Sequence, residues 1–388
     1  MTVSVSKWSP PQGGAEEFFF VAKAKSGGTF ASQIAEVFAD YGDAREDEGL
    51  DAETLVTATV FLSDSANQEE VLRAHPAFFG LIAREGAVTV VQQPPAGGKI
   101  GLQAYHVRRL DGTAVCTALT VAGAKAPAMA LSVATEGYRH MYLKNLLSLS
   151  PGGAFEQAED LLGFAGRCAQ SNGVVLTEVV RTWLYINDID ANYQAVSEAR
   201  NRVFDRFGIS NETSGFPAST GIEGRSADHR DVMMLDLVAI KGLKPGQARR
   251  MEAPGYMNPT VEYGVTFERG REVVFGDRRH LYVSGTASID DKGQILHVGD
   301  VRKQTKRAVT NVGALLGNSG AKLSDMRYLL VYLRDHADAE AVESTLAAGP
   351  LSKVPRIVVR APVCRPGWLV EMEGLAVDGK GDSQFAAF

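Results

Sequence analysis

The chain has 388 residues, of which 45% are hydrophobic, and its formal net charge is −6. At about 150 residues per domain this length predicts two or three domains, and the apolar fraction excludes disorder. The basic clusters are short and scattered, which excludes a continuous nucleic-acid-binding stripe. There is no apolar run of about 18 residues, and the first residues lack a charged stub followed by an apolar stretch, so we expect a cytoplasmic protein outside the membrane.

Three cysteines, Cys116, Cys168 and Cys364, lie far apart in the chain. Their odd number and wide spacing exclude a disulfide framework, and no histidine stands near them at zinc-ligand spacing. We therefore expect neither a metal site nor a cofactor. Reduced thiols are typical of the cytoplasm.

The predicted elements repeat three times along the chain. In the first repeat, a strand at 18–23 precedes a helix at 30–41, a strand ending at Asp64, a helix at 67–79 and two closing strands that end near Val107. The later repeats have matching strands at 139–144 and 279–284, helices at 155–169 and 301–316, Asp-ended strands at 183–188 and 330–335, helices at 192–207 and 339–347, and ends near Ile240 and Val377. The order β-α-β-α-β-β therefore occurs three times.

Each unit leaves one sheet face that its own helices do not cover, so we expect three units to pack about a pseudo-threefold axis. The predicted fold class is α+β, with repeat one at 15–110, repeat two at 125–242 and repeat three at 258–378. Residues 108–130 and 241–258 are predicted linkers because they are richer in Gly, Pro and charge, and 378–388 is a predicted loose tail. A fused pseudo-trimer needs no partner subunit, so we expect a monomer.

The last two predicted strands, 355–364 and 369–377, carry an unusual polar set. Pro366 and Gly367 suit a type II turn, and a hairpin closed by it would bring Cys364 opposite Leu369. The period of two then places the following residues on one face: Arg356, Arg360, Cys364, Glu371 and Glu373. Because the other face is apolar, this polar face must meet solvent, a neighbouring repeat or a ligand.

A comparison of the repeats separates residues with a structural role from candidate catalytic and binding residues. Counted back from the matched ends, Glu371 corresponds to Met234 and Gly101. An acid that only one repeat carries favours a single active site over a structural role. By the same count Arg181 is a lone charge in its strand, which indicates either a ligand contact or a cap of the sheet edge.

The third repeat resembles the YjgF/RidA family through Leu281 to Asp290, Gly293, Gly299, Gln304, Asn311, Pro355-Arg356 and Val370 to Gly374. Proteins of that family are homotrimers of chorismate-mutase-like units with small-molecule sites between subunits. A chain with three such units is similar to the chorismatase family, a fused version of this architecture. The resemblance covers most of the chain. It implies release of pyruvate from chorismate.

The resemblance also implies roles for individual residues. The family's acid falls at Glu371, and burial together with the like charge of Glu373 would keep it protonated near neutral pH. Arg356 matches the carboxylate-binding arginine of the YjgF/RidA family, and arginines suit the two carboxylates of chorismate. Further substrate-binding candidates are Arg181, Arg200, Tyr193, Thr220, Gly285 and Ala287. Alternatively, Arg200 is a helix-surface charge and Tyr193 a packing residue.

Two clues disagree on the ring product. Chorismatases that form 3-hydroxybenzoate resemble this chain in a cysteine seven residues before the acid, which makes Cys364 a second catalytic candidate; alternatively, Cys364 is an apolar filler. Ala287 counts against this product, which the resemblance associates with a smaller residue there. We expect 3-hydroxybenzoate, a precursor in secondary metabolism. The alternatives are hydrolysis to a trans-dihydroxycyclohexadiene carboxylate, an imine or enamine hydrolase, and a non-catalytic binder.

Overall fold

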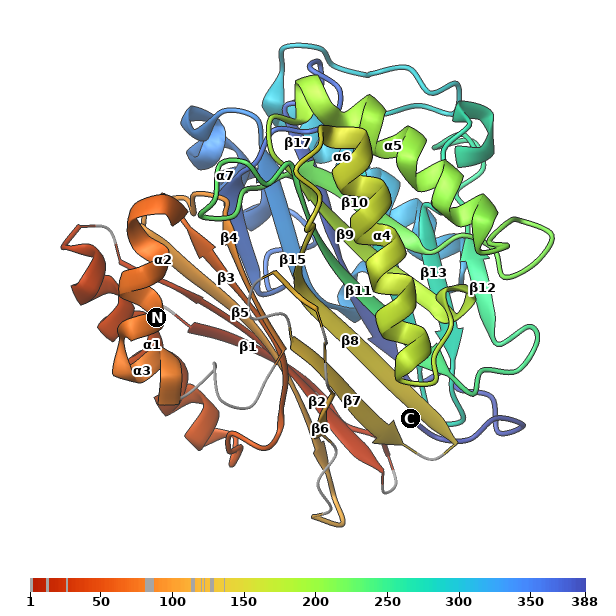
Figure 1. Ribbon diagram of the computed structural model, residues 1–388, viewed down its shortest axis with the longest axis horizontal. Coiled ribbons are helices and arrows are strands. Elements are labelled where there is room, and N and C mark those ends of the chain that lie inside the picture. Colours follow the sequence, from red (N-terminus) through yellow and green to blue (C-terminus); the bar gives the residue numbers. More distant parts are fainter. Residues whose placement is uncertain are drawn as a thin grey trace.

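The computed structural model of the chain describes residues 3–11, 14–25, 27–80, 87–112, 116–119, 121, 123–125, 129–135 and 137–388. Its strands form three mixed sheets, one from each repeat, with the helices outside and the sheets facing one another inside (Figure 1). This confirms the predicted α+β fold of three related units in one chain. Parts of the predicted first linker, namely 113–115, 120, 122 and 126–128, lie outside the described residues.

Sheet one has the strand order β1-β2-β5-β3-β4. Its elements are β1 (Val3–Trp8), β2 (Ala15–Lys23), α1 (Phe30–Asp47), β3 (Leu55–Leu62), α2 (Ser65–Ala74), α3 (Pro76–Phe78), β4 (Ala87–Gln92) and β5 (Ile100–Arg109). Helix α1 begins after Thr29 because the Thr29 side chain accepts a hydrogen bond from the Ser32 amide. Strands β3 and β4 are parallel, so a helical crossover must connect them.

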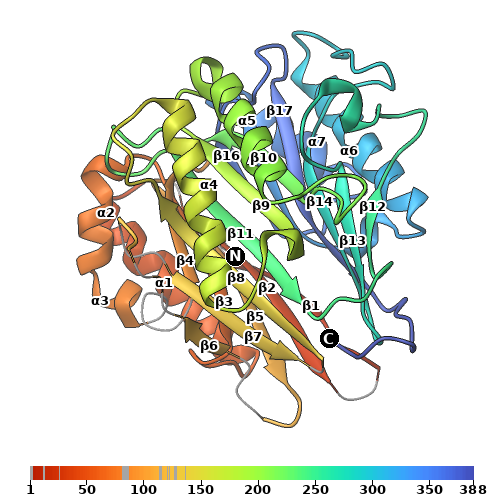
Figure 2. The same ribbon diagram turned by 45° about the vertical axis from the view of Figure 1, so that its right-hand side comes forward.

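Sheet two has the strand order β10-β9-β11-β8-β7-β6. Its elements are β6 (Cys116–Leu119), β7 (Met129–Thr135), β8 (Tyr138–Leu147), α4 (Ala154–Ser171), β9 (Val179–Ile186), α5 (Ile189–Arg206), β10 (Ala218–Glu223) and β11 (Met233–Lys241). Figure 2 shows α4 and α5 side by side on the outside of this sheet. Their apolar residues form one core with the side chains of β8, β9 and β11 that point outward.

Sheet three has the strand order β12-β13-β14-β17-β15-β16. Its elements are β12 (Ala248–Met251), β13 (Gly270–Val274), β14 (Arg279–Ala287), α6 (Val301–Asn318), β15 (Met326–Leu333), α7 (Ala339–Ala347), β16 (Arg356–Arg360) and β17 (Val370–Asp378). All nine residues of β17 are buried, because one of its faces packs under α6 and the other meets the neighbouring sheets. Among the described residues, no helix has the length and apolar character to cross a bilayer.

Each sheet starts with strands that precede the predicted β-α-β-α-β-β order: β1 in sheet one, β6 and β7 in sheet two, and β12 and β13 in sheet three. Strands β6 and β12 lie inside segments predicted as linkers. Both have only four residues and lie at a sheet edge, where charged and small residues are tolerated. Their composition therefore carries no clear strand pattern.

The predicted hairpin between 355–364 and 369–377 is wrong. Strand β16 pairs in parallel with β15, and β17 lies between β14 and β15. The connection from β16 to β17 therefore crosses the end of β15, where the Ala361 amide donates to Leu333 O at 2.8 Å. Pro366 and Gly367 do form the centre of a β-turn, in which the Trp368 amide donates to Arg365 O at 3.0 Å, but Gly367 lacks the positive φ of a type II turn and the turn closes no hairpin.

The predicted loose tail is also wrong. Phe388 is only 3% exposed. Its ring lies 4.9 Å from the ring of His140 and 5.3 Å from that of Phe275, and the Arg278 guanidinium carbon is 4.5 Å away. The segment that follows β17 is therefore anchored where repeats two and three meet.

Candidate active site

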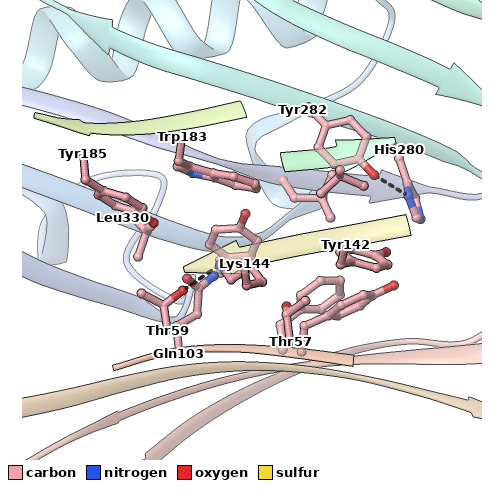
Figure 3. A pocket seen from close by; sticks show the side chains of 15 residues that line it. Thr57, Thr59, Gln103, Tyr142, Lys144, Trp183, Tyr185, His280, Tyr282 and Leu330 are labelled. Carbon is pink, nitrogen blue, oxygen red and sulfur yellow. Dashed lines mark hydrogen bonds between the residues drawn. The ribbon is translucent and has the colours of Figure 1, made fainter. Parts of the chain in front are cut away.

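A small cavity lies at the centre of the molecule, where the inner faces of the three sheets meet (Figure 3). Its volume of about 60 Å³ has room for a few water molecules, whereas a benzene-sized ligand needs about 150 Å³. Figure 3 shows Lys144 among the polar side chains that surround it. The Lys144 ammonium donates to Thr59 Oγ1 at 3.2 Å and to Asp236 Oδ2 at 2.5 Å. The cavity is thus too small for a ring-bearing substrate, and its ammonium group is already paired.

A larger cavity of about 270 Å³ lies between repeats two and three. Helix α5 and strand β10 supply one wall, and β14, β17 and the loop before β17 supply the other. The residues that line it are Tyr193, Arg200, Ser219, Thr220, Gly221, Val265, Phe267, Arg269, Gly285, Ala287, Ile289, Cys364, Arg365, Trp368 and Glu371. One carboxyl group, one thiol and three guanidinium groups therefore surround a space large enough for a small organic acid.

Glu371 is the carboxylic acid of this cavity. It lies on β17 opposite Ala287 of β14, and it is 5% exposed. Burial raises the pKa of Glu371 to about 8, and the negative charge of Glu373 contributes to this rise. The guanidinium groups of Arg269 and Arg181 oppose the rise in the pKa of Glu371. At neutral pH the Glu371 side chain is therefore mainly a neutral acid that can donate a proton.

A β-bulge forms the floor beneath Glu371. Two residues of β14, Ser284 and Gly285, stand opposite the single residue Glu373 of β17. The Gly285 amide consequently leaves the strand ladder and donates to Thr220 Oγ1 at 3.0 Å. A Cβ atom on Gly285 would overlap with Oε1 of Glu371. Glycine at this position therefore lets the carboxyl group lie directly on the backbone.

Glu373 is held by donors from repeat two. Its Oε1 accepts a hydrogen bond from Trp183 Nε1 at 2.6 Å, and its Oε2 accepts from Arg181 Nη2 and Thr220 Oγ1. Arg181 is 2% exposed and also donates to Thr220 Oγ1 at 2.7 Å. This buried ion pair joins the two repeats directly behind the cavity and fixes a negative charge two residues from Glu371.

Cys364 and Arg200 both interact with the side chain of Tyr193 in the wall of the cavity. Burial raises the pKa of the Cys364 thiol to about 12, so the thiol stays neutral. Arg200 is 3% exposed, and its Nε donates to Thr266 Oγ1 at 3.0 Å. Its Nη2 has no hydrogen-bond partner within the part of the chain that the structure describes. A buried guanidinium nitrogen of this kind fits an anionic group in the cavity.

Most of the residues singled out from the sequence meet in this one cavity: Glu371, Cys364, Arg200, Tyr193, Thr220, Gly285 and Ala287. Arg181 lies behind the cavity wall, in the ion pair with Glu373. Reasoning from the sequence misses Phe267, Arg269, Arg365 and Trp368, which also line the cavity. These four lie in connecting segments, where no strand or helix period indicates the direction of a side chain.

Arg356 lies outside the cavity. The pairing of β15 with β16 and β17 puts Ile357, and not Arg356, on the face of Glu371. The Nε of Arg356 donates to Glu343 Oε2 at 2.8 Å, and Glu343 also pairs with Lys23 of repeat one at 3.3 Å. The expectation that Arg356 shares a face with Glu371 is wrong because it rested on the hairpin.

The other two interfaces between repeats differ at the position of Glu371. Repeat two has Met234 there, and the cavity of about 220 Å³ at its interface with repeat one contains an ion pair of Lys125. Repeat one has Gly101, and the Ile357 side chain occupies the space that a side chain at Gly101 would need. Among the described residues, one of the three related interfaces therefore has a cavity with a neutral carboxylic acid, and the other two do not.

Comparisons with known proteins agree with this architecture. The model of the family described as Endoribonuclease L-PSP matches residues 272–378, which is most of repeat three. The 3-aminoacrylate deaminase RutC of Acinetobacter baylyi (strain ATCC 33305 / BD413 / ADP1) is 31% identical over 97 residues, or 25% of this chain and 77% of that protein. The chain belongs to the endoribonuclease L-PSP family.

This membership confirms the predicted relationship of repeat three to YjgF/RidA proteins. Over the whole chain, the fold is similar to that of a chorismatase solved as a crystal structure at 1.08 Å resolution. The TM-score is 0.66 at 19% sequence identity, and the match covers 97% of this chain and 99% of that one. This member of the endoribonuclease L-PSP family therefore has the chorismatase fold.

Proposed function

We propose that the chain releases pyruvate from chorismate, with Glu371 as the general acid. The observation that carries this proposal is a buried carboxyl group with a pKa of about 8 in a cavity that also contains the buried, partly unpartnered guanidinium of Arg200. Chorismate has two carboxylates and an enol ether, so it needs both cations and a proton donor. The chorismatase fold supports the same assignment.

The reaction begins with transfer of the Glu371 proton to the methylene carbon of the enolpyruvyl group. The side chain becomes an oxocarbenium ion, and water adds to its cationic carbon. The proton that this water releases restores the Glu371 acid, and the resulting hemiketal collapses to pyruvate. A free glutamate, with a pKa of about 4.3, would be ionised at neutral pH and could not begin this sequence.

For the ring product we propose 3-hydroxybenzoate. The ring keeps the ether oxygen and loses its hydroxyl group, together with a ring hydrogen, as water, so chorismate yields hydroxybenzoate and pyruvate without net hydrolysis. Cys364 supports this outcome as a neutral thiol in the wall of the cavity that holds Glu371. The alternative product is the trans-dihydroxycyclohexadiene carboxylate, which is favoured by Ala287 because its methyl group takes space beside the acid.

An imine or enamine hydrolase, or a non-catalytic binder, is the alternative from the wider family. The arginine that such a site requires by resemblance, Arg356, is already paired with Glu343 at a different interface. We also infer that the chain works as a monomer, since all three interfaces between repeats form within one chain, and that it works in the cytoplasm, where free thiols such as its three cysteines are typical. Gel filtration with light scattering tests the first of these two inferences.

The proposal is tested by incubating the purified protein with chorismate, following pyruvate and identifying the ring product by mass and ultraviolet absorbance. We expect pyruvate and 3-hydroxybenzoate, and a loss of about a thousandfold in rate for Glu371→Gln. Glu343→Gln is the matched control, because it removes a carboxylate of the same repeat outside the cavity. Formation of the dihydroxycyclohexadiene carboxylate would show that the ring product is not 3-hydroxybenzoate. Formation of pyruvate at only the spontaneous rate would refute the proposed release of pyruvate from chorismate.

A further inference from the structure

The connection between β12 and β13, residues 252–269, closes the cavity between repeats two and three. Val265 and Phe267 of this segment line the cavity. Thr266 Oγ1 donates to Asn201 Oδ1 of α5 at 2.8 Å, and Asn201 Nδ2 donates to Gly264 O at 3.2 Å. The segment is therefore fixed to repeat two although it leads into repeat three.

Phe267 lies close to two arginines that come from different repeats. Its ring centroid lies 5.7 Å from Cζ of Arg200 on α5 and 5.9 Å from Cζ of Arg269, the last residue before β13. Both guanidinium groups are also anchored to the connecting segment, because Arg200 donates to Thr266 and Arg269 donates from Nε and Nη2 to Asn258 O at 3.2 Å. All three side chains line the same cavity.

We propose that Phe267 is a positioning residue that holds Arg200 and Arg269 as a pair of anion-binding groups for a ligand with two carboxylates. Two guanidinium groups in a buried cavity repel each other, and an aromatic ring that attracts both keeps them in place before the ligand arrives. The geometry thus prepares the cavity for a dianion in the absence of substrate. The inference rests on the proposed function only for the identity of the natural ligand.

The test measures binding and turnover separately. Isothermal titration with benzene-1,3-dicarboxylate, a ring with two carboxylates, gives the dissociation constant in each variant. Chorismate turnover gives KM and kcat. The first variant, Phe267→Leu, keeps an apolar side chain but removes the aromatic ring. The second, Phe267→Tyr, keeps an aromatic ring at this position. Phe155→Leu is the matched control, since the Phe155 ring lies 4.6 Å from Cζ of Arg202 on the same helix α5 but outside the cavity.

We expect Phe267→Leu to weaken binding of the dicarboxylate about ten-fold and to raise KM by a similar factor, with kcat within about two-fold. Phe267→Tyr and Phe155→Leu should behave like the parent protein. Unchanged binding in Phe267→Leu, a loss confined to kcat, or no binding of the dicarboxylate by the parent protein would each overturn the inference. If the dicarboxylate binds as expected while chorismate is not turned over, the proposed function fails and the positioning role of Phe267 stands.

Discussion

Glu371 and Glu373 lie two residues apart on one strand, yet their surroundings give them opposite tasks. Glu373 receives three donors from repeat two, whereas Glu371 rests on the Gly285 backbone and faces the cavity. Burial without a comparable set of donors favours the neutral form of Glu371, and the fixed negative charge beside it acts in the same direction. The proposed role of Glu371 as the general acid therefore rests on its contacts and not on its residue type alone.

Gly285→Ala tests the fit between the bulge and the acid. The added methyl group would overlap with Glu371 Oε1 and approach Thr220 Cγ2 to 3.2 Å, so the carboxyl group must move. We expect a fall in kcat for pyruvate release of about a hundredfold, because small displacements of a reacting group are costly. Gly317→Ala is the control, since that position at the end of α6 has open space around it. Equal losses in the two variants, or none in Gly285→Ala, would contradict the described geometry.

Glu371 should reduce stability at the pH values where it is ionised in the unfolded chain. Its pKa is about 8 in the folded state, against an ordinary value of 4.5, so the folded chain binds the extra proton between these values. The free energy of unfolding therefore falls as pH rises from about 4.5 to about 8. We expect Glu371→Gln to be more stable than the parent protein by a few kcal/mol at pH 9 and equally stable at pH 4.5, as measured by urea unfolding. A variant that is no more stable at pH 9 would contradict the raised pKa.

At the scale of elements, the sequence predicts the helices and the Asp-ended strands well because each has its own hydrophobic period. It predicts strand pairing poorly, since pairing depends on neighbours far along the chain. Pro366 and Gly367 fit a tight turn locally, but β17 lies between β14 and β15. Glu371 was predictable because it differs from its counterparts Met234 and Gly101, and Cys364 because it stands seven residues before the acid, as in the family that the chain resembles. Phe267 and Arg269, in a connection without a period, could not be placed.

The segment after β17 packs against repeats two and three. Phe388 is 3% exposed among His140, Phe275 and Arg278, whereas Phe385 is only partly buried. We expect Phe388→Ala to lower the free energy of unfolding by about 3 kcal/mol or more and Phe385→Ala by clearly less. Chemical denaturation checks both variants. Equal, small effects would support the loose tail that the sequence predicts.

At the scale of the whole molecule, fusion of three units has allowed the three interfaces to diverge. One interface keeps the cavity with Glu371, a second contains the ion pair of Lys125, and the third is filled by Ile357. In a homotrimer all three interfaces would be identical, so a change that created the acid in one would create it in all. A single chain can instead keep one cavity with an acid and use the other interfaces for stability.

The contacts at the pseudo-threefold axis illustrate how the repeats stabilise one another. Lys144 pairs with Asp236 at the axis, and it also donates to Thr59 of repeat one. We expect Lys144→Met to lower the free energy of unfolding by about 3 kcal/mol or more, since it leaves Asp236 buried without its cation. The double variant Lys144→Met, Asp236→Leu should recover much of this loss, and kcat should stay within about two-fold in both. An unaffected single variant, measured by urea unfolding, would argue against a structural role for the pair.

The pH dependence of pyruvate release from chorismate tests the central claim most directly. A neutral Glu371 that donates the first proton predicts a kcat that is constant below the pKa of about 8 and falls about tenfold per pH unit above it, with Glu371→Gln near the spontaneous rate throughout. Release that rises through the same range, or that Glu371→Gln retains, would show that another group begins the reaction.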